Sequence, residues 1–285
     1  MKHFKGRIRR YEIVNEPNIT VASAEDYLHY QKIAYETIKS IDPAATVVGI
    51  CSTGDFGANS GKFVERAGEL GAFKYLDEVS FHPYDAPVDN PLADAEAGIA
   101  EIRATCDKFR KGVPILEDEL YYVTWPSQHQ GMRAGLSDAS QGRWWPDGHL
   151  VRRYAIDLAG GAVGSTPLSG FDQLACCDAA NRGLDFSRSF AGAFVPNGRF
   201  VASAAFAKYL CGARFKGKPK LADGLSGFVF TDRGGHEVTL VWARRFGATI
   251  KYAVPAGAKV RDLYGNALEG AEIAVSANPI YVFSK

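Results

Sequence analysis

Two groups of carboxylates in the first half of the chain could do acid–base or nucleophilic chemistry. Glu16 lies in an Asn-Glu-Pro-Asn motif that follows an apolar run, and the acidic run Glu117–Glu119 lies within another apolar run. Ionised groups on an apolar strand are costly unless they face a polar pocket or a partner. Two carboxyl groups about 5 Å apart can cleave a glycosidic bond with net retention, because one protonates the leaving oxygen and the other attacks the anomeric carbon. We therefore expect Glu16 and a member of the acidic run to face each other.

The acidic run leaves open which of its carboxylates takes part. Side chains alternate along a strand, so Glu117 and Glu119 are predicted to share one face and Asp118 to lie on the other. A Phe-His-Pro-Tyr motif containing His82 and Tyr84 ends a third apolar run. A histidine and a tyrosine there could orient a carboxylate by hydrogen bonding. A histidine whose hydrogen bonds are satisfied within a turn before proline is the alternative interpretation.

Other classes of site find little support in the sequence. The five cysteines are an odd number and contain no CxxC pair, which argues against a disulfide framework and a structural zinc site. His82, His129, Asp118 and Glu119 could in principle hold a metal, but no HxH or HExxH spacing is present. No glycine-rich phosphate loop follows a strand, and no serine lies in a nucleophile elbow. We expect neither a metal nor a cofactor.

Short apolar runs that alternate with longer helical patterns must position these residues. Runs of this kind, ending in polar residues, are typical of parallel strands buried on both faces. Their alternation with helices predicts parallel βα units, whose functional residues lie at the carboxyl ends of the strands. The expected strands are Arg9–Val14, Thr46–Cys51, Glu78–Phe81, Val113–Leu116 and Ser169–Leu174, and the expected helices are Ala24–Ile41, Lys62–Leu70, Asp94–Arg110 and His149–Leu158.

The pattern changes near residue 212. Beyond it, short segments alternate apolar and polar residues with a period of two, and turn residues separate them without an intervening helical pattern. This predicts a small antiparallel β-sandwich. We therefore expect two domains, an α/β domain over residues 1–212 and the β-sandwich over residues 213–285.

Composition excludes several classes of partner. Lys plus Arg number 33 and Asp plus Glu 32, so a net charge of +1 gives no basic surface for nucleic acid or anionic membrane. No apolar run reaches the roughly 18 residues that a membrane span requires. The basic N-terminus lacks the apolar stretch of a signal peptide, which makes a cytoplasmic location the default.

The motifs, in their order and spacing, make the chain resemble the retaining glycoside hydrolases of clan A, in particular families 39 and 5. The resemblance implies a TIM barrel and a carbohydrate substrate, with Glu16 as the acid/base and Asn15 contacting the sugar 2-hydroxyl. It implies Glu119 as the nucleophile, because that residue lies five positions after the proline of the Pro-Ile-x-x-x-Glu motif, although Glu117 stays an alternative. His82 would then lie beside the nucleophile, together with Tyr84.

Aromatic residues near the predicted cleft are candidates for stacking on a sugar ring. Trp125 follows the strand of the expected nucleophile, and Trp144 and Trp145 lie in a segment, residues 127–146, that is long for a βα loop. An indole face stacks well on a pyranose ring. We expect these side chains to bind substrate, although at least one of them is expected to serve packing instead.

The number of strands departs from the pattern of the family. A closed barrel needs eight strands, and five are expected here, so the fold prediction is a partial (β/α)8 barrel of strands four to eight. The open sheet edges are expected to favour self-association. The compartment of such a partial enzyme is unknown. The alternative function is a catalytically silent carbohydrate-binding or vestigial fragment of a glycosidase.

Overall fold

The computed structural model describes residues 2–54, 61–85, 91–122, 139–167, 198–245 and 247–284. The chain divides into two compact units. The first consists of Met1–Asp85, Asp94–Tyr121 and Gly160–Pro167, and the second of Ala86–Ala93, Tyr122–Ala159 and Leu168–Lys285. Each unit is described by itself. The domain boundary expected near residue 212 stays a prediction.

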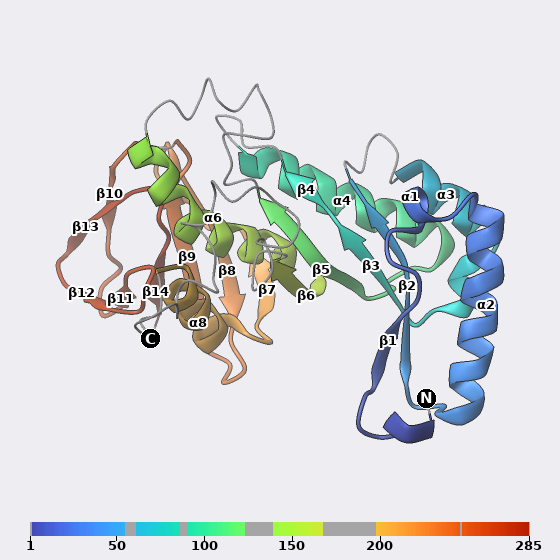
Figure 1. Cartoon of the computed structure of the whole chain (residues 1–285). Helices are drawn as coiled ribbons and strands as arrows, with labels where there is room; N and C mark the ends of the chain where they lie inside the picture. Colours follow the sequence, from blue (N-terminus) through green and yellow to red (C-terminus); the bar gives the residue numbers. More distant parts are fainter. Residues whose placement is uncertain are drawn as a thin grey trace, which may run out of the picture. The chain divides into compact units, whose positions relative to one another are not determined.

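Five parallel strands form a curled half-barrel in the first unit (Figure 1). They pair in the order β1-β2-β3-β5-β6, and a short strand β4 also pairs with β5. The strands are β1 (Arg10–Glu12), β2 (Thr46–Thr53), β3 (Glu78–His82), β4 (Tyr84–Asp85), β5 (Ile115–Tyr122) and β6 (Ala162–Pro167). The partial-barrel prediction is thus confirmed; β2 and β3 are buried along nearly their whole length, whereas β1 and β6 are partly exposed.

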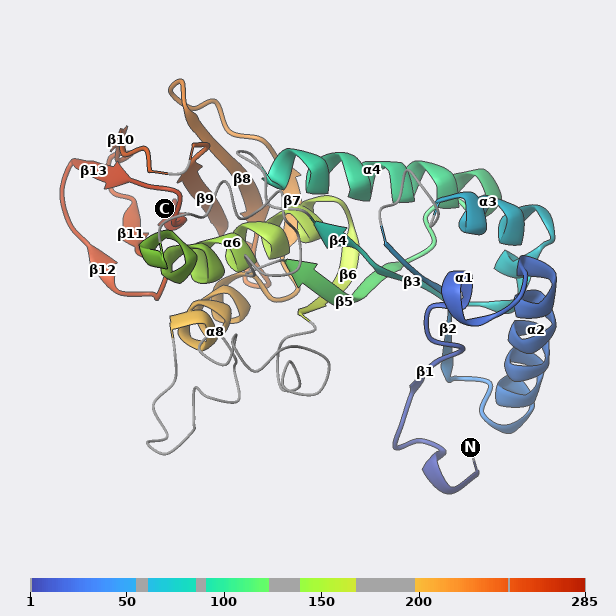
Figure 2. The ribbon, with the colours of Figure 1, turned by 45° about the horizontal axis from the view of Figure 1, so that its top comes forward.

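Helices α2, α3 and α4 lie along one face of this sheet (Figure 2). Helix α2 has the predicted bounds because Ser23 caps it, its hydroxyl accepting a hydrogen bond from the backbone N–H of Asp26 at 3.0 Å. Its buried face includes Tyr27 and Ile38, which pack towards the sheet. The helical elements of this unit are η1 (Lys2–Phe4), α1 (Pro17–Thr20), α2 (Ala24–Ile41), α3 (Gly61–Glu69), η3 (Ala72–Tyr75) and α4 (Pro91–Phe109).

The middle of the chain differs from expectation at one strand and one helix. The fifth parallel strand is β6, which was not predicted, whereas the expected strand over residues 169–174 lies outside the described residues. Helix α6 (Ala139–Ala159) begins ten residues before the expected helix and continues through Pro146. Trp144 and Trp145 are therefore helical and not in a loop. The difference has a physical source, since proline disfavours a helix interior and its presence at position 146 favours a loop up to that residue.

In its described residues, the second unit combines helices α6 and α8 (Gly198–Leu210) with antiparallel sheets. The two helices pack together through the rings of Tyr154 and Phe206, 5.4 Å apart. Six strands pair in the order β12-β11-β14-β9-β8-β7, and β10 pairs with β13. The strands are β7 (Arg214–Gly217), β8 (Leu225–Thr231), β9 (Glu237–Ala243), β10 (Ile250–Ala253), β11 (Lys259–Arg261), β12 (Ala267–Leu268), β13 (Glu272–Val275) and β14 (Ile280–Phe283).

One hydrophobic core joins the two antiparallel sheets. Val241 and Val282 of the larger sheet are buried together with Ile273 and Val275 of the smaller one. Two sheets that share a core in this way form a sandwich, as predicted. Among the helices that the structure describes, none has the length and apolar character needed to cross a lipid bilayer.

Candidate active site

A strained turn after β1 presents Glu16. Val14 and Glu16 have φ angles of 62° and 50°, a left-handed region that non-glycine residues rarely adopt. Pro17 begins the four-residue helix α1, and the Asn18 amide ties the turn to the end of β2 through two hydrogen bonds with the Thr53 backbone, at 2.9 and 3.0 Å. These contacts hold a conformation that costs about 1–3 kcal/mol per strained residue.

A bulge in β2 presents Cys51. The register of β2 on β3 shifts between Gly49 and Ser52, and Ile50 and Cys51 have φ angles of 74° and 39°. The Tyr27 hydroxyl of α2 accepts a hydrogen bond from the Ile50 backbone N–H inside the bulge. With Val14 and Glu16, these two are the non-glycine residues of positive φ in the described part of the chain. All four adjoin the same cluster of polar side chains.

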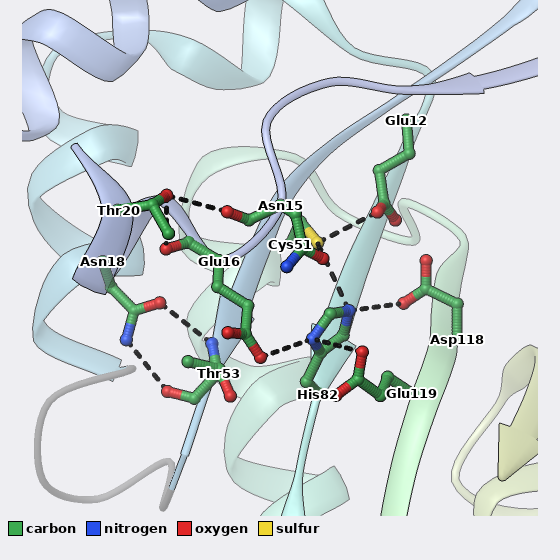
Figure 3. Close-up of polar contacts among 10 residues, drawn as sticks. All are labelled: Glu12, Asn15, Glu16, Asn18, Thr20, Cys51, Thr53, His82, Asp118 and Glu119. Atoms are coloured by element: carbon green, nitrogen blue, oxygen red, sulfur yellow. Dashed lines mark hydrogen bonds and ion pairs between the residues drawn. The ribbon is translucent and has the colours of Figure 1, made fainter. Parts of the chain in front are cut away.

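His82, the last residue of β3, lies at the centre of that cluster (Figure 3). It is only 2% exposed. Its Nδ1 atom lies 2.9 Å from Glu16 Oε1 and 3.5 Å from Glu119 Oε2. Its Nε2 atom lies 3.3 Å from Cys51 Sγ and 3.5 Å from Asp118 Oδ1. Each ring nitrogen therefore faces a different set of acidic groups.

Strand β5 contributes both Asp118 and Glu119 to the cluster, which corrects the prediction that they lie on opposite faces. The pairing of β5 with β6 shifts register between Glu117 and Leu120, so strict alternation does not hold over this segment. Glu117 is fully buried, whereas the side chains of Asp118 and Glu119 are 23% and 20% exposed. Glu119 is thus the carboxylate of β5 that shares a histidine nitrogen with Glu16.

The carboxylates of Glu16 and Glu119 converge. One oxygen of each, together with a His82 ring nitrogen, forms a group whose atoms all lie within 4.8 Å of one another. The two side chains are 16% and 20% exposed, so both reach the surface of this half-barrel. Their oxygens therefore lie nearer to each other than the roughly 5 Å expected between the carboxyl groups of a nucleophile and an acid/base in retaining glycoside cleavage.

Glu12, the last residue of β1, forms a carboxyl pair with Asp118. The residue is exposed as a whole, but partial desolvation of its carboxyl raises the pKa of Glu12 to about 7, and a hydrogen bond and charge repulsion from Asp118 act in the same direction. Burial would also raise the pKa of Asp118, but hydrogen bonds from His82 and Glu12 outweigh it and lower that pKa. A carboxyl–carboxylate hydrogen bond requires a proton, so near neutral pH the pair shares one, held mainly by Glu12.

The surrounding acids keep His82 charged. Burial alone would lower the pKa of His82, yet hydrogen bonds with Asp118, Cys51 and Glu16 raise it to about 11. The imidazolium therefore persists at neutral pH. Burial raises the pKa of the Cys51 thiol, whose S–H donates to Glu12 Oε1 at 3.1 Å. The cluster holds a thiol, an imidazolium and several carboxyl groups in direct contact.

The structure brings together only part of the predicted site. Asn15 is exposed, with its side-chain oxygen 3.9 Å from Cys51 Sγ. Tyr84 begins β4, and Trp144 and Trp145 lie in α6, but their side chains lie outside the described part of the structure. Trp125 lies outside the described residues.

Sequence reasoning missed Glu12 and Cys51 as members of the cluster, and it placed Asp118 on the wrong face. The sequence does hold a signal for Glu12, because it is an acidic residue within the apolar run that precedes Glu16. Nothing in the sequence marked Cys51, because its position depends on the bulge.

Three solved structures report on the fold. A family 39 glycoside hydrolase from Bacteroides cellulosilyticus WH2 aligns with a TM-score of 0.75 at 19% identity, covering 100% of this chain and 59% of that chain. A family 51 α-L-arabinofuranosidase from Bifidobacterium longum aligns with a TM-score of 0.63 at 14% identity, covering 96% and 66%. A family 44 xyloglucanase from Paenibacillus polymyxa aligns with a TM-score of 0.57 at 12% identity, covering 97% and 66%.

These alignments confirm the fold implied by the resemblance to clan A glycoside hydrolases. The likeness is one of fold, since the identities are low. The chain spans about three fifths to two thirds of the length of these structures. No family model matches the sequence, and no curated protein matches it.

Proposed function

We propose that this chain hydrolyses O-glycosidic bonds with net retention of configuration, using Glu16 as the acid/base and Glu119 as the nucleophile. The observation that carries the proposal is the convergence of their carboxylates on one nitrogen of His82, within 4.8 Å of each other. The fold shared with glycoside hydrolases supports it. Inverting enzymes keep their two carboxyl groups about 6.5–9.5 Å apart, so the observed separation favours the retaining mechanism.

The geometry suggests how the two steps proceed. Glu16 gives its proton to the glycosidic oxygen while a Glu119 oxygen attacks the anomeric carbon, which releases the leaving alcohol and forms a glycosyl ester. A water molecule then attacks the same carbon, Glu16 takes its proton, and the ester bond to Glu119 breaks. The Nδ1–H of His82, 2.9 Å from Glu16 and 3.5 Å from Glu119, orients both carboxylates through the cycle.

The test is a panel of aryl glycosides on the purified chain. The panel includes furanosides and pyranosides, because the similar structures include an arabinofuranosidase and a xyloglucanase. We expect Glu119→Gln to abolish turnover. Glu16→Ala should spare substrates with good leaving groups, which need no proton, and azide should rescue it as a glycosyl azide of retained configuration. Glu25→Gln, an exposed carboxylate on α2, is the matched control and should leave turnover unchanged.

Trapping identifies the nucleophile directly. A 2-fluoro glycoside with a good leaving group should add one sugar to the chain, and peptide mass spectrometry should place it on Glu119. A label on Glu117, or products of inverted configuration, would reject the assignment. A folded protein that binds sugars without turning over any member of the panel would favour the catalytically silent carbohydrate-binding alternative.

A further inference from the structure

The proposed chemistry uses only one side of His82, and the other side carries a second cluster. Cys51 Sγ lies 3.3 Å from His82 Nε2 and 3.1 Å from Glu12 Oε1. Asp118 Oδ1 lies 3.5 Å from the same Nε2 atom. A sulfur from the β2 bulge and an imidazole nitrogen from the end of β3 thus meet carboxylate oxygens from the end of β1 and from within β5 (Figure 3).

The spacings of Cys51 Sγ from His82 Nε2 and Glu12 Oε1 are near those of ligands around a tetrahedral zinc ion. Zinc binds thiolate sulfur at about 2.3 Å, imidazole nitrogen at about 2.0–2.1 Å and carboxylate oxygen at about 2.0–2.2 Å, so tetrahedral ligands stand roughly 3.3–3.6 Å apart. The contacts of Cys51 with His82 and Glu12, and of His82 with Asp118, are 3.3, 3.1 and 3.5 Å. The ligand atoms of Glu12, Cys51 and His82 all lie within 4.8 Å of one another.

The surroundings supply what such a site needs. In metal-binding histidines the N–H of the second ring nitrogen usually donates a hydrogen bond to a carboxylate, a backbone carbonyl or water, which fixes the ring orientation and the tautomer. His82 does so, with Nδ1 2.9 Å from Glu16 Oε1. Cys51 is held in the β2 bulge and is buried, whereas Glu12 is exposed and the Asp118 side chain is 23% exposed. An ion would therefore enter past the two carboxylates.

We propose that Cys51, His82 and Glu12 form a three-ligand binding site for a thiophilic divalent cation of the zinc type, with Asp118 beside it. The mixed sulfur, nitrogen and oxygen ligands favour such an ion over magnesium or calcium, which take oxygen ligands. Binding displaces the thiol proton, the Nε2 proton and the proton shared by the two carboxyl groups into solvent, and the cation takes their place. The proposal stands apart from glycosidase activity, because it needs no substrate.

The test is metal titration of the full chain after removal of metals with EDTA. Zinc is titrated against a chromogenic chelator, and cobalt is followed through its thiolate-to-metal charge-transfer absorption. We expect one zinc ion to bind through Cys51. We expect magnesium not to compete with zinc for the site. Cys51→Ser should weaken zinc binding at least tenfold and remove the cobalt band. Cys106→Ser is the matched control, since Cys106 is buried in α4 away from this cluster, and it should change neither.

A second variant guards against misfolding. Glu12→Gln changes an exposed residue and should also weaken zinc binding at least tenfold while the cobalt band persists. Zinc affinity unchanged in both the Cys51 and the Glu12 variants would overturn the proposal. A cobalt spectrum without the thiolate band would also overturn it, and would place the ion instead on Glu16, His82 and Glu119, which offer no sulfur. None of these readouts depends on turnover, so failure here is distinguishable from failure of the proposed function.

Discussion

Replacement of Gly49 by alanine tests whether helix α2 holds the bulge that positions Cys51. A Cβ atom at this position would lie 2.7 Å from Gln31 Nε2 and 2.9 Å from the Tyr27 hydroxyl. Both side chains are fully buried, so neither can retreat into solvent. The Tyr27 hydroxyl donates to Gln31 Oε1 at 3.0 Å and accepts from the Ile50 N–H, and Gln31 Nε2 donates to the Tyr75 carbonyl at 2.7 Å.

The cost follows from these contacts. Forcing a methyl group into a packed core costs about 1–3 kcal/mol. Displacing one of the side chains also breaks a buried hydrogen bond, which contributes about 1 kcal/mol. We therefore expect Gly49→Ala to lower the free energy of unfolding of this unit by about 2–4 kcal/mol. The bulge should shift with it and move Cys51 relative to His82.

The assay is urea unfolding followed by circular dichroism, with hydrogen exchange of α2 peptides to report on this unit alone. Gly98→Ala in α4 is the matched control, because its Cβ would meet nothing within 4 Å. That change should be neutral or stabilising by up to about 1 kcal/mol, since alanine is the better helix former. If Gly49→Ala is as stable as the wild-type chain, then Tyr27 and Gln31 do not support the bulge.

Three further outcomes are expected. At pH 8 iodoacetamide should alkylate the exposed Cys211 and spare Cys106, because burial raises the pKa of the Cys106 thiol to about 12. Peptide mass spectrometry measures both reactions, and alkylation of Cys106 before Cys211 would contradict this expectation. Asp157→Asn should destabilise the chain by about 1–3 kcal/mol in thermal unfolding, because it removes the charge that lies 2.7 Å from the buried Arg153 guanidinium. Asn18→Ala removes two hydrogen bonds to the end of β2 and should lower the free energy of unfolding in urea by about 1–3 kcal/mol. A smaller loss would mean that the turn after β1 is stable without these hydrogen bonds.

Local features of the fold were predictable where local chemistry decides them. Helix α2 has the predicted bounds because a serine cap and a helical apolar pattern specify both its start and its buried face. Strand β3 was predictable to within one residue, because a polar residue follows its apolar run, whereas β5 continues to Tyr122, well past the predicted end at Leu116. Strand β6 was missed, since Gly160, Gly161 and Gly164 lie in or beside it and weaken the strand pattern.

The candidate site was less predictable, because long-range packing sets it. Ile50 and Cys51 adopt a left-handed backbone that their own preferences oppose, and a tyrosine from α2 holds them there. Sequence motifs for metal sites find ligands spaced along one helix or loop. Glu12, Cys51 and His82 come from three different strands, so no spacing rule connects them.

The position of His82 has a consequence for how this chain can vary. Its two ring nitrogens face separate sets of acidic residues, and that ring, with Asp118 and Cys51 beyond it, connects Glu119 to Glu12. Substitutions on the two sides should therefore be epistatic, with double variants departing from the sum of the single ones. In a deep mutational scan, tolerance at Glu12 would depend on which residue occupies position 119.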